Sequence, residues 1–183
     1  MTKKSYFKAL CLTILPLLIV LLTPIYLVSP LSVNIPIPAQ VYGEMWYMNH
    51  TGTEINFASS NTSYPLFFTT SEKLNGFSFV GGFNLSSNLT AQFAGIYKAN
   101  YLASGSGQNN HNYFTTVLIN GLEQNNCMSH KKMTAGGDIV TMTGSCLINL
   151  VVGDNVQLST MDYDGTGTGK YYAGNLNLVR IGN

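Results

Sequence analysis

Two polar segments of the sequence hold side chains that could bind a ligand through hydrogen bonds. The first spans residues 104–112, and the second spans residues 163–170, directly after an acidic residue. Because loops on a rigid scaffold carry much of a protein's binding function, we predict that these segments contact the ligand. The candidate contact residues are Gln108, Asn109, Asn110, His111, Asp162 and Asp164.

The run Asp162-Tyr163-Asp164-Gly165 is also similar to the start of a calcium-binding loop. An EF-hand loop continues with further oxygen ligands and ends on a glutamate. Residues 165–170 supply only Gly, Thr and Lys, a composition that is typical of a turn. Asp162 and Asp164 are therefore a calcium candidate with a plain turn as the alternative, and we expect no other metal or cofactor.

The sequence contains no organised set of catalytic residues. His50, His111 and His130 lie in different segments, without a partner at the spacing of a metal site or a catalytic triad. No serine stands in the G-x-S-x-G pattern of hydrolases, and the chain has only 8 acidic residues. We therefore predict a protein that is not an enzyme.

The N-terminal residues predict contact with a membrane. Lys3, Lys4 and Lys8 precede an apolar run, residues 9–28, that carries no charge. About 20 apolar residues can cross a hydrocarbon core of about 30 Å, and lysines before such a run keep that end in the cytoplasm. Residues 1–28 are thus a signal anchor, formed by one hydrophobic helix, or a cleaved signal peptide. Both export the remainder, and the prolines of residues 29–40 predict an extended linker.

Export makes Cys127 and Cys146 a candidate disulfide, since the third cysteine, Cys11, lies within the apolar run. Gly136-Gly137 lies midway between the two cysteines and suits a tight hairpin turn. A two-residue turn at these glycines would pair the cysteines across one ladder. Two free buried thiols are the alternative.

The charge balance argues against a nucleic-acid partner. The 183 residues include 9 Lys and Arg against 8 Asp and Glu, which gives a formal net charge of +1. Charged residues make up 9% of the chain, whereas soluble domains average roughly 25%. Such a chain has no long-range field that would attract a polyanion.

Short runs of aromatic and β-branched residues recur between Gly and Asn clusters from residue 41 to residue 183, which is typical of an all-β domain. Turn dipeptides such as Asn75-Gly76 and Asn120-Gly121 separate these runs. This many strands bury enough surface only in two packed antiparallel sheets or a barrel, so we expect a sandwich or jelly roll. The predicted strands are residues 44–48, 54–57, 64–69, 76–80, 89–93, 95–103, 112–119, 123–132, 139–152, 155–161 and 170–180.

The alternation of side chains predicts which strand faces are buried. Tyr97, Ala99 and Tyr101 alternate with more polar residues and predict a core-facing strip. Residues 146–152 and 175–181 instead have aliphatic side chains and Asn, and no charge, on the outer side. An outer face with so little charge is a candidate subunit interface, although a carbohydrate-binding or virion surface would have a similar composition.

Four Asn-x-Ser/Thr sequons in the exported part could accept glycans where the host has the machinery. Their acceptor residues are Asn49, Asn61, Asn84 and Asn88.

Three motifs occur in a familiar order: Gly95-Ile96-Tyr97, Leu150-Val151-Val152-Gly153-Asp154-Asn155-Val156-Gln157-Leu158 and Ala173-Gly174-Asn175-Leu176. They resemble the G-x-Y, L-x-x-G-D-x-V-x-L and S-G-x-L signatures of the C1q/tumour-necrosis-factor-like jelly rolls. Gly43-Glu44-Met45-Trp46 and Leu74-Asn75-Gly76-Phe77 are similar to C1q-like heads of phage and other viral or environmental structural proteins. The resemblance implies a ten-stranded antiparallel jelly roll over residues 41–183, a homotrimer, and a binding head instead of an enzyme.

Three functions are consistent with these observations. The first is a non-enzymatic structural or receptor-binding head on a virion or phage-like surface, anchored through residues 9–28 or secreted after cleavage. The second is a cellular type II membrane adhesin or a ligand of the TNF/C1q kind. The third is an exported carbohydrate-binding module, so that the receptor is a protein or a glycan.

Overall fold

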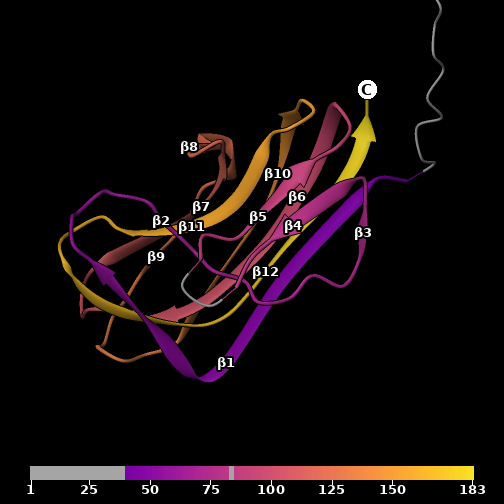
Figure 1. The fold of residues 1–183 in the computed structure, drawn as a ribbon. Helices are drawn as coiled ribbons and strands as arrows, with labels where there is room; N and C mark the ends of the chain where they lie inside the picture. Colours follow the sequence, from indigo (N-terminus) through magenta and orange to yellow (C-terminus); the bar gives the residue numbers. More distant parts are fainter. Residues whose placement is uncertain (1–39, 83–84) are drawn as a thin grey trace, which may run out of the picture. The chain divides into compact units, whose positions relative to one another are not determined.

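Two antiparallel sheets make up the part of the chain that the computed structural model describes, residues 40–82 and 85–183 (Figure 1). Sheet A has five strands in the order β10-β6-β12-β1-β3. Sheet B has seven, with the path β4-β5-β11-β7-β8, while β2 pairs with β11 and β9 pairs with β7. The elements are β1 (Tyr42–Phe57), β2 (Tyr64–Pro65), β3 (Leu74–Asn75), β4 (Phe77–Val80), β5 (Asn88–Ala91), β6 (Gly95–Ser106), β7 (Asn112–Ile119), β8 (Leu122–Glu123), the 3₁₀ helix η2 (Asn125–Cys127), β9 (Ser129–Lys132), β10 (Val140–Leu150), β11 (Asn155–Asp162) and β12 (Gly167–Gly182).

The described residues contain no α-helix, and thus none of the length and apolarity that a membrane span requires. The hydrophobic helix predicted over residues 9–28 lies outside the described residues, as does the predicted linker except for Gln40. The anchor or signal peptide therefore stays a prediction.

Strand β6 shows why these residues form a sandwich. Tyr97, Ala99 and Tyr101 are buried, whereas Ile96 and Lys98 on the opposite face are exposed. Because successive side chains of a strand point to opposite faces, one face of β6 packs inside and the other meets solvent. The predicted core-facing strip is confirmed.

The core lies between the two sheets and has two clusters. The larger contains fully buried side chains from both sheets, among them Met45, Leu158 and Leu176. Complete burial of such a side chain stabilises the fold by about 1.5–3 kcal/mol. The smaller cluster consists of Phe57, Tyr113, Met133 and Met142.

Strands β1 and β12 pair from Tyr42 opposite Val179 to Phe57 opposite Gly167. Their register shifts between Met48 and Thr53, and Figure 1 shows β1 bending sharply along its course beside β12. In the irregular segment, Asn49 Oδ1 accepts hydrogen bonds from the Thr51 N–H at 3.0 Å and the Thr51 hydroxyl at 2.8 Å. Asn49 Nδ2 donates to Thr53 Oγ1 at 3.1 Å. The Asn49 side chain thus holds the backbone where the ladder is interrupted.

The disulfide between Cys127 and Cys146 is confirmed, with Cα atoms 5.2 Å apart. Its predicted position on one hairpin ladder is wrong. Cys127 ends η2, beside sheet B, whereas Cys146 lies in β10, which pairs with β6 in sheet A. The strands on either side of Gly136-Gly137 do not pair with each other, because β9 pairs with β7. The glycines therefore lie in a loop that crosses between the sheets, and the disulfide joins the two layers.

The observed strands follow most of the predicted positions but differ in number. The described residues contain twelve strand segments, whereas the sequence predicted eleven and the resemblance implied ten, and the predicted strands 44–48 and 54–57 are parts of β1. The predicted strand 123–132 is divided into β8, η2 and β9. The Cys127 N–H donates to Gln124 O at 2.8 Å, and Thr116 Oγ1 donates to the same oxygen at 3.0 Å. These bonds hold a helical turn where an extended strand was expected.

Two residues of the recognised motifs have clear structural roles. Asp154 Oδ2 accepts a hydrogen bond from the Val151 N–H at 2.8 Å and closes the turn between β10 and β11. A Cβ atom on Gly174 would lie 1.6 Å from the hydroxyl oxygen of buried Tyr171. Glycine at this position therefore gives the Tyr171 side chain the space it occupies in the core.

Candidate functional site

The two loops predicted to contact a ligand meet at one end of the sandwich. His111 Nδ1 lies 2.7 Å from Asp162 Oδ2. The backbone N–H and side-chain amide of Asn112 donate to Asp164 Oδ2 at 2.7 and 2.6 Å. The structure therefore brings His111 close to Asp162 and Asp164, although His111 and Asp162 are 51 residues apart in the chain.

The other predicted contact residues lie in the first of these loops. Gln108 Nε2 donates to Thr168 O at 3.2 Å and so joins this loop to β12. Asn109 and Asn110 are exposed, and the Asn110 N–H donates to Met133 O at 2.8 Å. Their side-chain amides face solvent and are available to a partner, while Gln108 is engaged within the molecule.

Asp162 has a fully buried side chain whose oxygens accept hydrogen bonds from protein groups. Oδ1 accepts from the N–H groups of Asp164 at 3.1 Å and Gly165 at 3.3 Å, and Oδ2 faces His111. Calcium usually takes six to eight oxygen ligands. Within residues 40–82 and 85–183, no group of three His, Cys, Asp or Glu side chains could hold a metal ion. The observed role of Asp162 is to clamp the loops together, and the calcium candidate gains no further acidic ligand from this part of the chain.

Charge and burial fix the ionisation of this end of the molecule. Burial raises the pKa of Tyr113 to about 12, against the lowering effect of a hydrogen bond from the Gln108 N–H, and neighbouring Asp162 raises it further. Hydrogen bonds from Asn112 hold the pKa of exposed Asp164 below its ordinary value. Tyr113 is therefore neutral and Asp164 ionised around neutral pH.

The remaining histidines are not part of this loop cluster. His130 stacks on Phe114 with ring centroids 5.4 Å apart, and His50 is exposed in the irregular part of β1. Among the described side chains, no serine hydroxyl or cysteine thiol is hydrogen-bonded to a histidine. The arrangement of a nucleophile with an adjacent base is thus not formed by this part of the chain.

The sequons are distributed over different parts of the surface. Asn61 is exposed and adopts a positive φ of 53° in the segment before β2. Asn49 lies in the irregular part of β1, and Asn88 begins β5. Asn84 lies outside the described residues. Glycosylation of these residues stays a prediction.

The two low-charge segments singled out in the sequence come together in sheet A. Residues 146–150 lie in β10 and residues 175–181 lie in β12, with β6 between them. In one outward row, Trp46 pairs with Asn175, Asn175 with Leu102, and Leu102 with Thr143. We call this surface the neutral face, which consists of Tyr42, Trp46, Met48, Asn100, Leu102, Leu147, Asn175, Asn177 and Val179.

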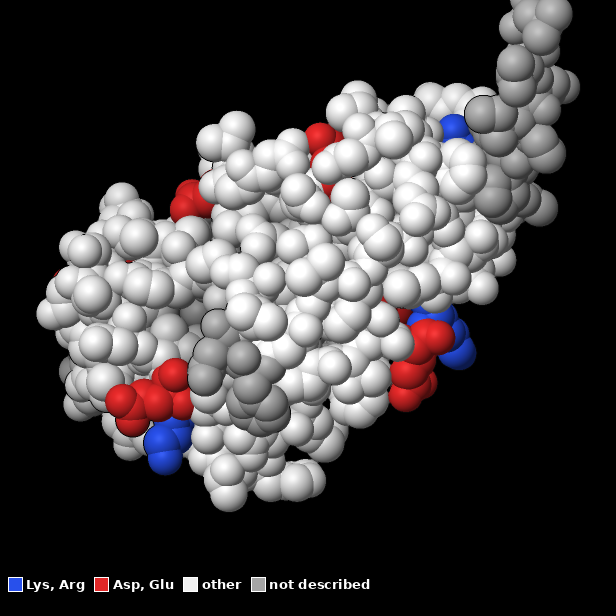
Figure 2. Space-filling model, viewed as in Figure 1, with Lys and Arg blue, Asp and Glu red and all other residues white. Residues whose placement is uncertain are grey.

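Two charged side chains, Glu44 and Lys98, border the residues of the neutral face on β1 and β6. Met48 is 62% exposed and Leu147 is 54% exposed. The scarcity of charge extends over the molecule: in the view of Figure 2, small charged groups lie near the margins of a largely uncharged surface. Exposed apolar side chains on a face with little charge are typical of a protein interface.

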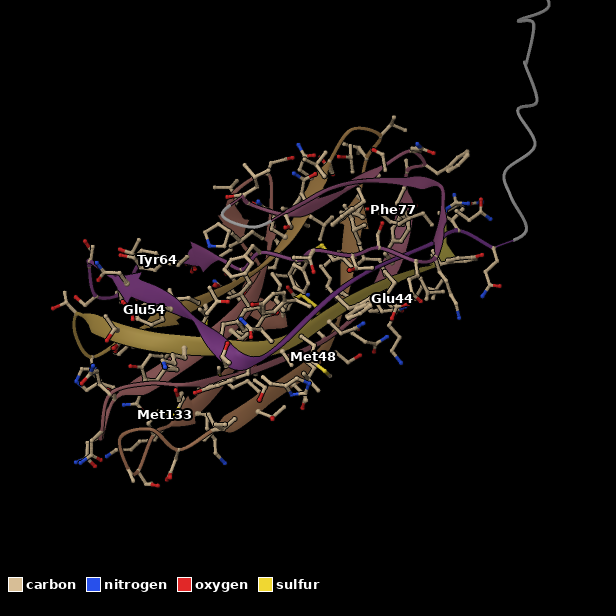
Figure 3. All side chains as sticks on the ribbon, turned by 60° about the horizontal axis from the view of Figure 1, so that its bottom comes forward. Glu44, Met48, Glu54, Tyr64, Phe77 and Met133 are labelled. Atoms are coloured by element: carbon tan, nitrogen blue, oxygen red, sulfur yellow. A yellow bond between two sulfur atoms is a disulfide. The ribbon has the colours of Figure 1, made fainter. Side chains whose placement is uncertain are left out.

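Beyond the irregular segment of β1, the same sheet carries a groove, to which the two predicted ligand-contacting loops contribute Ser106, Gly107 and residues 168–170. Its volume is 270 Å³. Figure 3 shows Glu44, Met48 and Glu54 in this order along β1, so that the groove residue Glu54 follows the neutral face. We call it the polar groove, lined by Glu54, Ser106, Gly107, Gly137, Thr168, Gly169, Lys170 and Tyr172. These residues come from four distant segments, and no short motif connects them.

No family model matches the sequence, and no curated protein matches it. Solved structures are similar in fold at low sequence identity. Eiger TNF from S. frugiperda is 7% identical, with a TM-score of 0.52 over 79% of this chain and 94% of that one. The globular domain of zebrafish complement 1qA is 12% identical, with a TM-score of 0.50 over 78% of this chain and 99% of that one. Murine APRIL is 9% identical, with a TM-score of 0.51 over 76% and 99% of the two chains.

These likenesses agree with the motifs seen in the sequence and with the two observed antiparallel sheets. The all-β prediction is confirmed. The described part of the chain has the jelly-roll fold of TNF and C1q globular domains.

Proposed function

We propose that this protein is a non-enzymatic binding head that assembles as a homotrimer through its neutral face. The observation that carries the proposal is the gathering of exposed and half-buried apolar and amide side chains on the outer side of sheet A. The resemblance of the sequence motifs to C1q/TNF-like proteins supports three as the number of subunits.

The chemistry of the neutral face suits a second copy of the chain. Burying apolar surface contributes about 25 cal/mol per Å², and stable interfaces bury roughly 800 Å² on each partner. The Asn100 and Asn177 side chains can exchange hydrogen bonds across such an interface, and few charges would lose their hydration. The cost of removing this face from water is therefore small.

The two charged residues of this surface can pair across a subunit contact. Glu44 lies on β1 and Lys98 on β6, with β12 between these strands. Asn175 Nδ2 donates to Glu44 Oε1 at 2.8 Å, which orients the carboxylate. A head-to-tail contact can bring Glu44 of one subunit to Lys98 of the next, and repetition of such a contact closes a ring.

The disulfide supports export, because such bonds persist in oxidising compartments. In an exported trimer, the exposed Asn109 and Asn110 would present the loop end to a receptor. The His111–Asp162 contact would keep that end ordered, since it joins the two loops. Binding by a fixed surface, and not catalysis, is the activity this arrangement supports.

We place this head on a virion or phage-like particle, in keeping with the resemblance of residues 43–46 and 74–77 to viral C1q-like heads. Detection of the protein on intact particles by a specific antibody would support this setting. Its detection on cells without particles would favour the alternative, a cellular type II adhesin or ligand.

Chemical crosslinking of the full chain tests the assembly. The chain is kept in a detergent without a sugar headgroup and crosslinked over a range of concentrations. The expected ladder ends at three subunits, and Met48→Lys shifts it toward one subunit. A ladder that stays at one subunit, or that ends at two, would overturn the homotrimer.

A further inference from the structure

The polar groove contains several hydrogen-bonding side chains that no group in residues 40–82 or 85–183 engages. Glu54 and Lys170 face each other in the β1–β12 register, but neither side chain makes an ion pair or hydrogen bond within the described residues. The hydroxyls of Ser106, Thr168 and Tyr172 also make no hydrogen bond within the described part of the chain. A hollow with a few convergent polar groups is the usual form of a small-ligand site.

Three of the residues that line the groove, Gly107, Gly137 and Gly169, are glycines and leave only backbone there. A Cβ atom on Gly169 would lie 2.7 Å from the Ser106 carbonyl oxygen, so no larger residue fits there without a shift. Tyr172 stands at the side, where its ring packs on Gly52; a Cβ on Gly52 would lie 2.7 Å from Tyr172 Cε1. The 270 Å³ of space is close to the lower end of ligand sites, which range over about 300–1,000 Å³.

The charge of the groove restricts the class of ligand. Glu54 and Lys170 are its only charged lining residues, and their charges cancel. A neutral ligand rich in hydroxyl groups can satisfy both, because a carboxylate accepts hydrogen bonds and an ammonium donates them. Tyr172 adds an apolar ring surface beside these groups.

We propose that the polar groove binds a neutral pyranose sugar. In this site the apolar C–H face of the sugar packs on Tyr172, its hydroxyls donate to Glu54, and a ring or hydroxyl oxygen accepts from Lys170. A pyranose with two or more hydroxyls on one side can form hydrogen bonds with Glu54 and Lys170 at the same time. The site is separate from the neutral face and does not depend on the self-association proposed above.

The test is a titration of the full chain, in a detergent without a sugar headgroup, with methyl glycosides of glucose, galactose and mannose. Calorimetry or ligand-observed NMR would follow binding, and a glucuronic acid glycoside serves as the anionic comparison. We expect saturable binding of at least one neutral glycoside with a Kd of about 1 mM. Glu54→Gln and Tyr172→Ala are expected to weaken it at least about 10-fold.

Matched variants keep the test independent of folding. Tyr172→Phe retains the ring on Gly52 and is expected to keep most of the affinity, and Glu72→Gln changes an exposed glutamate outside the groove and should keep all of it. Absence of saturation by every neutral glycoside up to about 10 mM would overturn the proposal. So would equal loss of affinity in Glu72→Gln and Glu54→Gln, or a preference for the anionic glycoside.

Discussion

The neutral face and the polar groove lie on one side of the same sheet, yet their chemistry differs. Strands β1, β6 and β12 contribute to both. On the neutral face they present Trp46, Leu102 and Asn175 outward, whereas in the groove they present Glu54, Ser106 and Lys170. The register shift between Met48 and Thr53 separates the two. An interrupted ladder can therefore divide one sheet into a surface suited to a protein partner and a hollow suited to a small ligand.

The two surfaces differ in charge because they differ in whether their charged groups stay hydrated. A face that is buried in an interface loses the hydration of every charge it carries, so charges are costly there. A groove that stays open keeps its charged groups hydrated until a ligand enters. Because the Asn49 hydrogen bonds hold the bend, the part of β1 before it can lie in the neutral face and the part after it in the polar groove.

The largest expected effect comes from removing the disulfide, which ties β10 beneath the neutral face to η2. A variant with Cys127→Ser and Cys146→Ser should lose about 2–4 kcal/mol of unfolding free energy, because the unfolded chain is no longer constrained. Denaturation in urea under non-reducing conditions measures this loss. Self-association should weaken as well, since β10 carries Leu147, while sugar binding in the groove should persist. Unchanged unfolding would show that the bond is absent or without consequence.

A charge introduced on the neutral face should weaken self-association and so test the role of this surface independently of the groove. Met48→Lys should weaken association by about 2 kcal/mol, or roughly 30-fold, because the cation would be buried without a partner. Sedimentation over a concentration series measures the change. Val80→Lys is the matched control, since Val80 is 55% exposed on β4 of the other sheet. Equal weakening by both variants would contradict the assignment of the interface to the neutral face.

The bend can be altered by Gly52→Ala. Gly52 has a φ of +72°, and an added Cβ would press on the Tyr172 ring. The backbone strain predicts a loss of about 1–2 kcal/mol in unfolding free energy. Sugar affinity should fall because Tyr172 moves, while the subunit number stays the same. Thermal unfolding and the glycoside titration measure these effects, and a loss of assembly without loss of sugar binding would reverse the proposed roles.

Alkaline pH is expected to act on the end that carries the groove, because Gly107, one of its lining residues, packs on Tyr113. The folded pKa of Tyr113 is about 12, above its ordinary value of 10.0, because of burial. The unfolded chain therefore releases this proton first, and the stability that Tyr113 contributes is full below pH 10 and lost as pH rises toward 12. Urea unfolding across this range measures the slope, which Tyr113→Phe should make shallower. An equal slope in both proteins would contradict this account.

The burial of side chains within a single strand was predictable from the sequence, because the alternation between buried and exposed positions depends only on local residue order. The burial of Tyr97, Ala99 and Tyr101 is an example. Which strand pairs with which was harder to predict from the sequence. Cys127 and Cys146 were correctly paired, but Gly136-Gly137 fits a sheet-crossing loop as well as a hairpin, so their ladder was wrong.

Of the candidate sites, the loop cluster was predictable from the sequence and the polar groove only in part. Five of its lining residues lie in the two loops that we predicted to contact a ligand, namely Ser106, Gly107, Thr168, Gly169 and Lys170. Polar loop composition pointed to His111 and Asp162, which the structure brings into contact. Glu54, Lys170 and Tyr172 stand on strands whose register brings them together, and strand register depends on long-range pairing. The close approach of Gly169 to β6, where an added Cβ would lie 2.7 Å from the Ser106 carbonyl oxygen, has no local sequence signal.

The central claim is that the neutral face joins three copies of the chain. Light scattering combined with absorbance gives the protein mass of the full chain within its detergent complex, under non-reducing conditions. The account predicts three times the chain mass of 19.9 kDa, falling toward one chain mass in Met48→Lys. A single chain mass for the unaltered protein across the concentration range would contradict it.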